Sequence, residues 1–259
     1  MIKPSQNIKK IQTPLIIGHR GAAGYAPENT IAGFKKAAAL GVRWVEFDVR
    51  LTHDGQPVLF HDETLERTTN GSGHVSDQDW ETMKELDAGE WYCLRDEPAF
   101  AGEHIPTLKD AIEILQNLGL GANVEIKATP GREVESGHRI AAELQKYWPG
   151  SLPPPLLSSF QRECIEAAMD KAPNIARALI VGKVPGNWKE TLLTLGCEGL
   201  HCRHNQVNKQ QARQIIESGF SLRCYTVNTD QKAQKLVEWG VESVFTDYPD
   251  RIHNTIDAR

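Results

Sequence analysis

Residues 15–30 read LIIGHRGAAGYAPENT, and this stretch indicates how the fold begins. Its apolar start is typical of a buried strand, and it leads directly into a histidine, an arginine and a glycine-rich turn. Glycines at positions 21 and 24 permit a tight connection and let backbone N–H groups approach an anion. Arg20 offers a planar fork for phosphate oxygens, and His19 offers a base beside it. We therefore expect a turn that holds a phosphate next to a base, whereas a plain strand-to-helix connection would need only the glycines.

The remaining sequence alternates short apolar runs with segments of helical spacing. This alternation predicts parallel strands joined by helices, which is an α/β fold. Eight such strands in 259 residues fit a closed (β/α)8 TIM barrel, and an open doubly wound sheet is the alternative. The strand runs are 14–19, 43–50, 122–127, 155–160, 175–181, 198–203, 221–227 and 243–247, and the helical segments are 30–40, 108–118, 132–147, 161–170, 187–195, 208–217 and 230–239.

One apolar run, 57–61, follows the strand 43–50 too closely for a parallel crossover, which needs about a dozen residues. An Asp-Gly pair at 54–55 lies between them and is a strong hairpin signal. We therefore expect 57–61 to fold back antiparallel on the preceding strand. That pairing would bring His61 close to Asp48.

Residues 62–106 then interrupt the alternation, with a short helical pattern near 77–86. We expect one catalytic barrel domain over 1–259, with 62–106 as an insertion after the second-strand hairpin and over one end of the barrel. Thr107 and Asp110 have the spacing of a capping box and predict a helix start after the insertion.

The composition excludes several classes of protein. The formal net charge of −5 gives no support to nucleic-acid binding, for which a basic patch is expected. The sequence has no apolar run of the length of a spanning helix, so no membrane insertion is expected. Residues 1–14 are polar and basic without the apolar centre of a signal peptide, and the five cysteines form no Cys-x-x-Cys pair. These features predict a cytoplasmic protein with reduced thiols.

Carboxylates alternate with apolar residues along two of the predicted strands. In 45–49, valine and phenylalanine point one way while Glu46 and Asp48 point the other, and Glu125 and Lys127 repeat the pattern in 124–127. Helices cover the outside of a barrel, so the acids should face the interior, where unpaired charge is costly. Three carboxylates there suggest one hard divalent cation, Mg²⁺ or Ca²⁺. The alternative is an internal salt-bridge network with the basic residues.

Two histidines, His19 and His61, end apolar strands that are expected to reach the same rim. Either one alone is more often an ordinary packed histidine, but the pair beside a cation and an arginine suits acid–base catalysis of phosphoryl transfer. Phe160 and Tyr225 also end strands and could form an apolar wall for a substrate or simply pack in the barrel. The cluster HCRH at 201–204 lies on one strand end, where neighbours alternate faces, so packing is favoured over metal binding.

Read together, these segments resemble the glycerophosphodiester phosphodiesterase family, and its cytoplasmic bacterial members in particular. The likeness spans about 14–250 and rests on GHRGAAGYAPENT at 18–30, EFDVRLTHDGQPVLFHD at 46–62, ERTTNG at 66–71, EIK at 125–127, YTVN at 225–228 and TD at 246–247. No single motif is specific, but their combination in this order is.

The resemblance implies a fold, a reaction and a set of residue roles. The fold is a TIM barrel with an insertion after the HD motif. The reaction is hydrolysis of a small glycerophosphodiester, such as glycerophosphocholine or glycerophosphoethanolamine, to an alcohol and sn-glycerol 3-phosphate. The implied roles are metal ligands for Glu46, Asp48 and Glu125, an acid–base pair for His19 and His61, phosphate binding for Arg20 and Lys127, and support of the substrate-binding first loop for Glu28 and Asn29.

Several alternatives stay open at this point. The nucleophile is either water or the substrate's own 2-hydroxyl through a cyclic phosphate, and the two histidines could exchange roles. Headgroup preference, the choice between Mg²⁺ and Ca²⁺, and the oligomeric state are not specified by the residues. A phospholipase on a related barrel would share the same acids and histidines but would need a membrane-binding surface. A non-catalytic phosphodiester-binding barrel would usually lack one of them.

Overall fold

Eight parallel strands form a closed barrel in this computed structural model, which describes residues 10–95 and 100–256. The strands run in the order β1-β9-β8-β7-β6-β5-β4-β2, and pairing of Gly18 with Val45 joins β1 to β2 and closes the ring. The predicted (β/α)8 barrel is therefore confirmed, and the open sheet is excluded. The strands are β1 Ile16–Gly18, β2 Trp44–Leu51, β4 Gly121–Ile126, β5 Leu156–Ser159, β6 Ala176–Val181, β7 Gly199–Arg203, β8 Ser221–Tyr225 and β9 Ser243–Thr246.

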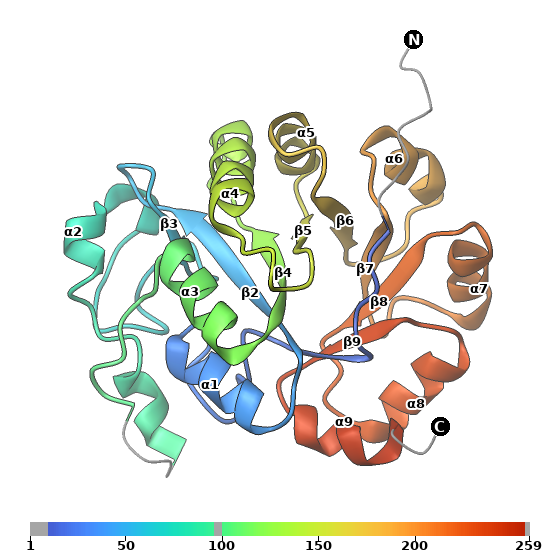
Figure 1. The fold of residues 1–259 in the computed structure, drawn as a ribbon, viewed down its shortest axis with the longest axis horizontal. Helices are drawn as coiled ribbons and strands as arrows, with labels where there is room; N and C mark the ends of the chain where they lie inside the picture. The colour runs from blue at the N-terminus through green and yellow to red at the C-terminus, as the bar shows by residue number, and fades with distance from the viewer. Residues whose placement is uncertain (1–9, 96–99, 257–259) are drawn as a thin grey trace.

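Helices surround this barrel (Figure 1). They are α1 Ile31–Ala39, α3 Leu108–Leu118, α4 Glu133–Tyr147, α5 Arg162–Lys171, α6 Trp188–Thr194, α7 Lys209–Glu217, α8 Asp230–Glu238 and α9 Pro249–Ile256. The first seven match the helical segments of the sequence, and the capping box of Thr107 and Asp110 is present at the start of α3. The last helix was missed, although Pro249 at its first position is a typical helix start.

The hairpin after β2 is also confirmed. β3, Pro57–Leu59, pairs antiparallel with β2 through Val49 and Leu59, and the backbone N–H of Phe60 donates to the carbonyl of Asp48 at 3.0 Å. The described part of the segment 62–106, residues 62–95 and 100–106, follows and lies outside the ring of helices, beside β3 and α1 (Figure 1). It contains η1 Val75–Asp77, α2 Trp80–Met83 and η2 Glu90–Arg95, with a small apolar core of its own under β3.

Side chains of β2 alternate as the sequence predicts. Val45, Phe47 and Val49 pack in the layer between barrel and helices, where the ring of Phe47 lies 5.3 Å from that of Phe34 on α1. Glu46 and Asp48 point to the opposite side, into the barrel. In this period-two pattern the apolar side chains pack against the helices, and the acids are grouped on the inner face of the barrel.

Two other sequence expectations concern cysteines and membranes. Cysteines 164, 197, 202 and 224 are buried and unpaired, whereas Cys93 lies outside the residues whose side chains are described. Among the described residues, no helix combines the length and apolar character needed to cross a bilayer.

A buried ion network lies near the amino ends of the strands. Arg223 on β8 is fully buried; its Nη1 lies 2.5 Å from Glu198 and its Nη2 lies 2.9 Å from Glu242. Its Nε donates to Thr13, which precedes β1, at 2.9 Å. The guanidinium therefore joins three loops on the side of the barrel away from the candidate site.

We expect Arg223→Met to reduce the free energy of unfolding by about 3–5 kcal/mol, because it leaves the buried carboxylate of Glu198 without its cation. Arg213→Met is the matched control, since the pair of Arg213 with Glu217 is exposed and should contribute only about 0–1 kcal/mol. Denaturant unfolding of both variants measures the difference. Equal, small losses would show that the network adds nothing to stability.

Candidate active site

The carboxyl ends of the strands surround a cavity of about 370 Å³. It is lined by side chains from most of the barrel, namely His19, Arg20, Glu46, His61, Asn123, Glu125, Lys127, Phe160, Ile180, His201, Arg203, His204, Tyr225, Thr226 and Phe245. The cavity end of a TIM barrel is where active sites form. It collects both histidines, the arginine, the lysine and two of the three acids that the sequence singled out.

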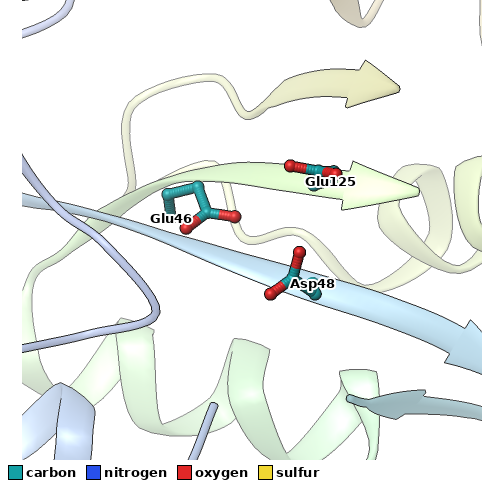
Figure 2. Close-up of side chains that lie close together, drawn as sticks. All are labelled: Glu46, Asp48 and Glu125. Atoms are coloured by element: carbon teal, nitrogen blue, oxygen red, sulfur yellow. The ribbon is translucent and has the colours of Figure 1, made fainter. Parts of the chain in front are cut away.

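The three acids meet at one point. Glu46 and Asp48 rise from β2 and Glu125 from the neighbouring β4, as Figure 2 shows, and Asp48 and Glu125 are register partners across these strands. Each acid offers an oxygen within 4.8 Å of the oxygens of the others, and all three side chains are buried. Among the described residues this is the one group of acids, histidines and cysteines with that geometry.

The electrostatics of this group fit a divalent cation. Burial and the neighbouring Asp48 raise the pKa of Glu46 to about 8, and its Oε1 is buried without a hydrogen-bond partner in the described part of the chain. Burial and Asp48 also raise the pKa of Glu125. An orphaned buried oxygen beside two more carboxylates matches the all-oxygen ligand set that Mg²⁺ and Ca²⁺ prefer.

Arg20 and Lys127 hold part of this negative charge. Arg20 Nε lies 3.2 Å from Asp48, and Lys127 Nζ lies 2.5 Å from Glu125 and 3.5 Å from Asp48. Burial alone would raise the pKa of Asp48, but these two cations hold it well below its usual range. The internal salt-bridge network, which was the alternative to a metal site, is therefore present. Neither Arg20 nor Lys127 forms a salt bridge with Glu46. Both basic side chains also line the cavity, where they can meet a phosphate.

The first loop positions these groups through an unusual backbone. Arg20 has φ of 49° and Gly21 has φ of 91°, and a Cβ on Gly21 would lie 2.7 Å from the backbone of Gly33. The N–H of Arg20 donates to the carboxylate of Glu46 at 3.0 Å, which ties β1 to the acids of β2. A non-glycine residue at positive φ is costly, and such strain is found where function needs it.

The N–H groups of the two loop glycines are both engaged within the fold. The N–H of Gly21 donates to the carbonyl of Glu46 at 3.2 Å, and that of Gly24 donates to the carbonyl of Asp247 at 3.0 Å. These donors hold the loop against β2 and the end of β9. These two N–H groups are therefore not available to a phosphate, whereas the side chains of Arg20 and Lys127 line the cavity.

Each of the two histidines is held by the carboxylate of an aspartate. His19 Nδ1 lies 2.6 Å from a carboxylate oxygen of Asp247, and His61 Nδ1 lies 2.6 Å from Asp62. A carboxylate partner fixes the tautomer and the orientation of an imidazole and leaves Nε2 for chemistry. Burial lowers the pKa of His61. For His19, burial is outweighed by the hydrogen bond to Asp247 and the charge of Glu46, so its pKa is raised.

Several supporting residues were missed from the sequence. Asp247 and Asp62 entered the sequence analysis only as parts of motifs. Asp247 is the last residue of the predicted run 243–247, and Asp62 immediately follows the predicted run 57–61. Asn29, which was expected only to support the loop, exchanges two hydrogen bonds with Asp48, through its amide N–H at 3.0 Å and its amide oxygen at 3.1 Å. Asn123 lies two residues before Glu125 on the same inward face, so the alternation could have found it.

The apolar candidates and the HCRH cluster also have defined places. Phe160 and Tyr225 both line the cavity, with ring centroids 6.1 Å apart, so they form a wall as well as a packed pair. His201 is buried against the ring of Phe245, and burial lowers its pKa well below the usual value. The packing interpretation of this cluster is therefore supported, although Arg203 and His204 reach the rim of the cavity.

A second hollow of about 280 Å³ adjoins the cavity on the far side of His19 and Arg20. Two of its lining residues, Arg67 and Trp91, come from the segment 62–106. Glu28 also lies here, with its carboxylate 2.6 Å from Arg20 Nη1. The insertion thus contributes a side wall next to the first loop.

Fold and site together define a TIM-barrel enzyme equipped for phosphoryl transfer, and comparison with known proteins identifies its family. The model of the glycerophosphoryl diester phosphodiesterase family matches residues 19–251. The chain therefore belongs to this family, and it is a phosphoric diester hydrolase.

Individual relatives agree over almost their whole length. A Bacillus subtilis glycerophosphodiester phosphodiesterase is 33% identical, with 92% of this chain and 85% of the relative covered. One from Caldanaerobacter subterraneus subsp. tengcongensis is also 33% identical, with 93% and 97% covered. A solved Oleispira antarctica phosphodiesterase, in complex with the product sn-glycerol-3-phosphate, is 40% identical with a TM-score of 0.90 over 95% of this chain and 97% of that one.

Proposed function

We propose that this protein hydrolyses small deacylated glycerophosphodiesters, such as glycerophosphocholine and glycerophosphoethanolamine, with one divalent cation, Mg²⁺ or Ca²⁺. The products are the alcohol and sn-glycerol 3-phosphate, the product bound by the Oleispira antarctica relative. The observation that supports this best is the presence of two carboxylate-held histidines and three clustered acids around one cavity. Single features of this kind occur in many proteins, but an acid–base pair beside a cation site is the equipment of phosphodiester hydrolysis.

Each residue has a distinct part in this proposal. Glu46, Asp48 and Glu125 would hold the cation, which when bound polarises the phosphate and neutralises developing charge. Arg20 and Lys127 bind phosphate oxygens from two sides of the acids. His19 accepts a proton from the nucleophile, and His61 donates one to the departing alcohol. Attack by water and attack by the 2-hydroxyl use the same two proton transfers to release the alcohol. In the second route water must then open the cyclic phosphate, with a base for the water and an acid for the departing 2-oxygen.

Substrate size follows from the cavity. Its volume of about 370 Å³ and the wall formed by Phe160 and Tyr225 suit a glycerol phosphate with a small headgroup. Residues 1–259 are proposed to act as one catalytic domain, with 62–106 beside the site. The four buried free thiols fit a reducing compartment, so the cytoplasm is the proposed location.

The test is an assay of choline and sn-glycerol 3-phosphate release from glycerophosphocholine, run with added Mg²⁺ or Ca²⁺. Lysophosphatidylcholine serves as the acylated comparison. We expect the deacylated diester to be hydrolysed with the higher kcat/KM. Preference for the acylated substrate would favour the phospholipase alternative, and binding without turnover would favour a phosphodiester-binding barrel.

A further inference from the structure

One side chain of the insertion contacts both supports of the reaction centre. Arg67 Nε and Nη2 donate to the two carboxylate oxygens of Asp62 at 2.6 and 3.0 Å. Its Nη1 and Nη2 donate to the two oxygens of Glu28 at 2.8 and 2.7 Å. A planar guanidinium has two edges that each match a carboxylate, and here both edges are occupied.

These two carboxylates hold different parts of the site. Glu28 accepts from Arg20 Nη1 at 2.6 Å, and Asp62 accepts from His61 Nδ1 at 2.6 Å. The path from Arg67 to a phosphate-binding group and the path from Arg67 to an acid–base group therefore each contain a single intermediate residue. Glu28 and Asp62 are 34 positions apart in the sequence, and Arg67 brings them to one cation.

The contact has an electrostatic consequence. Hydrogen bonds from Arg67 hold the pKa of Asp62 well below its usual range. Burial would raise the pKa of Glu28, but Arg67 and Arg20 together lower it. An anionic Asp62 can only accept, so His61 Nδ1–H donates a hydrogen bond to it and Nε2 is left for chemistry on a side chain that lines the cavity. Without the guanidinium, two like charges would face each other and the histidine and arginine would lose their fixed directions.

We propose that Arg67 is a positioning residue that sets Arg20 and His61 in place through Glu28 and Asp62. This inference rests on the proposed function of the site. The insertion would then support catalysis, in addition to forming a side wall of the second hollow. The role requires a guanidinium, because a lysine ammonium is a single point donor and cannot match two carboxylates along two edges.

We expect Arg67→Ala to lower kcat/KM for glycerophosphocholine by about 10–100-fold, the range found when outer partners of site ligands are removed. Both kcat and KM should change, because His61 and Arg20 are both affected. Arg67→Lys should regain only a minor part of the loss. Since Arg67 is half exposed and lines the second hollow, millimolar guanidinium added to Arg67→Ala should restore activity, whereas methylammonium should not.

Arg132→Ala is the matched control, since Arg132 also donates to a carboxylate, Glu135, through two hydrogen bonds and to the carbonyl of Thr52, yet lines neither cavity. It should leave activity unchanged and be insensitive to guanidinium. A double-mutant cycle adds a second test: the effect of Arg67→Ala should shrink in an Asp62→Asn background.

The outcomes separate this inference from the proposed function. If the wild-type protein hydrolyses no glycerophosphodiester, the proposed function fails. If the wild-type protein is active and Arg67→Lys or a folded Arg67→Ala keeps activity within about twofold, the positioning role is wrong. Additive losses in the cycle, or a loss that guanidinium cannot restore, would also overturn it.

Discussion

Removal of the divalent cation is expected to abolish hydrolysis of glycerophosphocholine and to lower the midpoint of thermal unfolding. Three buried carboxylates within 4.8 Å of one another repel when no cation is bound, and Arg20 and Lys127 offset only part of that charge. A cation that binds only the folded protein stabilises it by mass action. The chelated enzyme should therefore be both inactive and less stable, and addition of Mg²⁺ or Ca²⁺ should reverse both changes.

Glu125→Gln tests the ligand set directly, because it keeps the shape of the side chain and removes one charge. We expect weaker cation binding by calorimetry in addition to lower activity. Glu166→Gln is the control, since Glu166 is exposed on α5 away from the cavity. Full activity in excess chelator, with elemental analysis showing no bound metal, would contradict the metal proposal.

The fold was predictable because its signals are local. Period-two alternation in 45–49 specifies which side of β2 meets the helices, and the Asp-Gly pair at 54–55 specifies the hairpin. The last helix, Pro249–Ile256, was missed even though its proline signal was present. The position of the insertion beside the first loop depends on tertiary contacts, such as that of Arg67 with Glu28, which no local pattern encodes.

The meeting of His19 and His61 at one cavity was predictable, but the carboxylates that hold them were not. His19 and Asp247 are 228 positions apart and meet because β1, the first strand, pairs with β9, the last. The glycine turn has a composition that suits an anion nest, yet the N–H groups of Gly21 and Gly24 bond to backbone carbonyls. Composition shows which backbone conformations are allowed, and only the closed structure shows where each N–H points.

Removal of His61 and removal of His19 should affect kcat/KM differently when the leaving group of the substrate is changed. We expect His61→Ala to lose about 10²–10⁴-fold in kcat/KM on glycerophosphocholine, the usual contribution of general acid catalysis, and far less on a nitrophenyl phosphodiester. Choline is a poor leaving group that needs a proton, whereas a nitrophenolate departs without one. His19→Ala should lose activity on both substrates, because the nucleophile needs a base whichever group leaves.

His53→Ala is the matched control, since His53 also contacts an aspartate, Asp79, but on the exposed surface. It should match the wild-type enzyme on both substrates. The raised pKa of His19 and the lowered pKa of His61 would by themselves favour the exchanged roles. A bound cation neutralises the charge of Glu46, one of the two groups that raise the pKa of His19, so the substrate comparison is the decisive measurement. A selective loss on glycerophosphocholine for His19→Ala would exchange the roles, and equal losses on both substrates for His61→Ala would argue against an acid role for it.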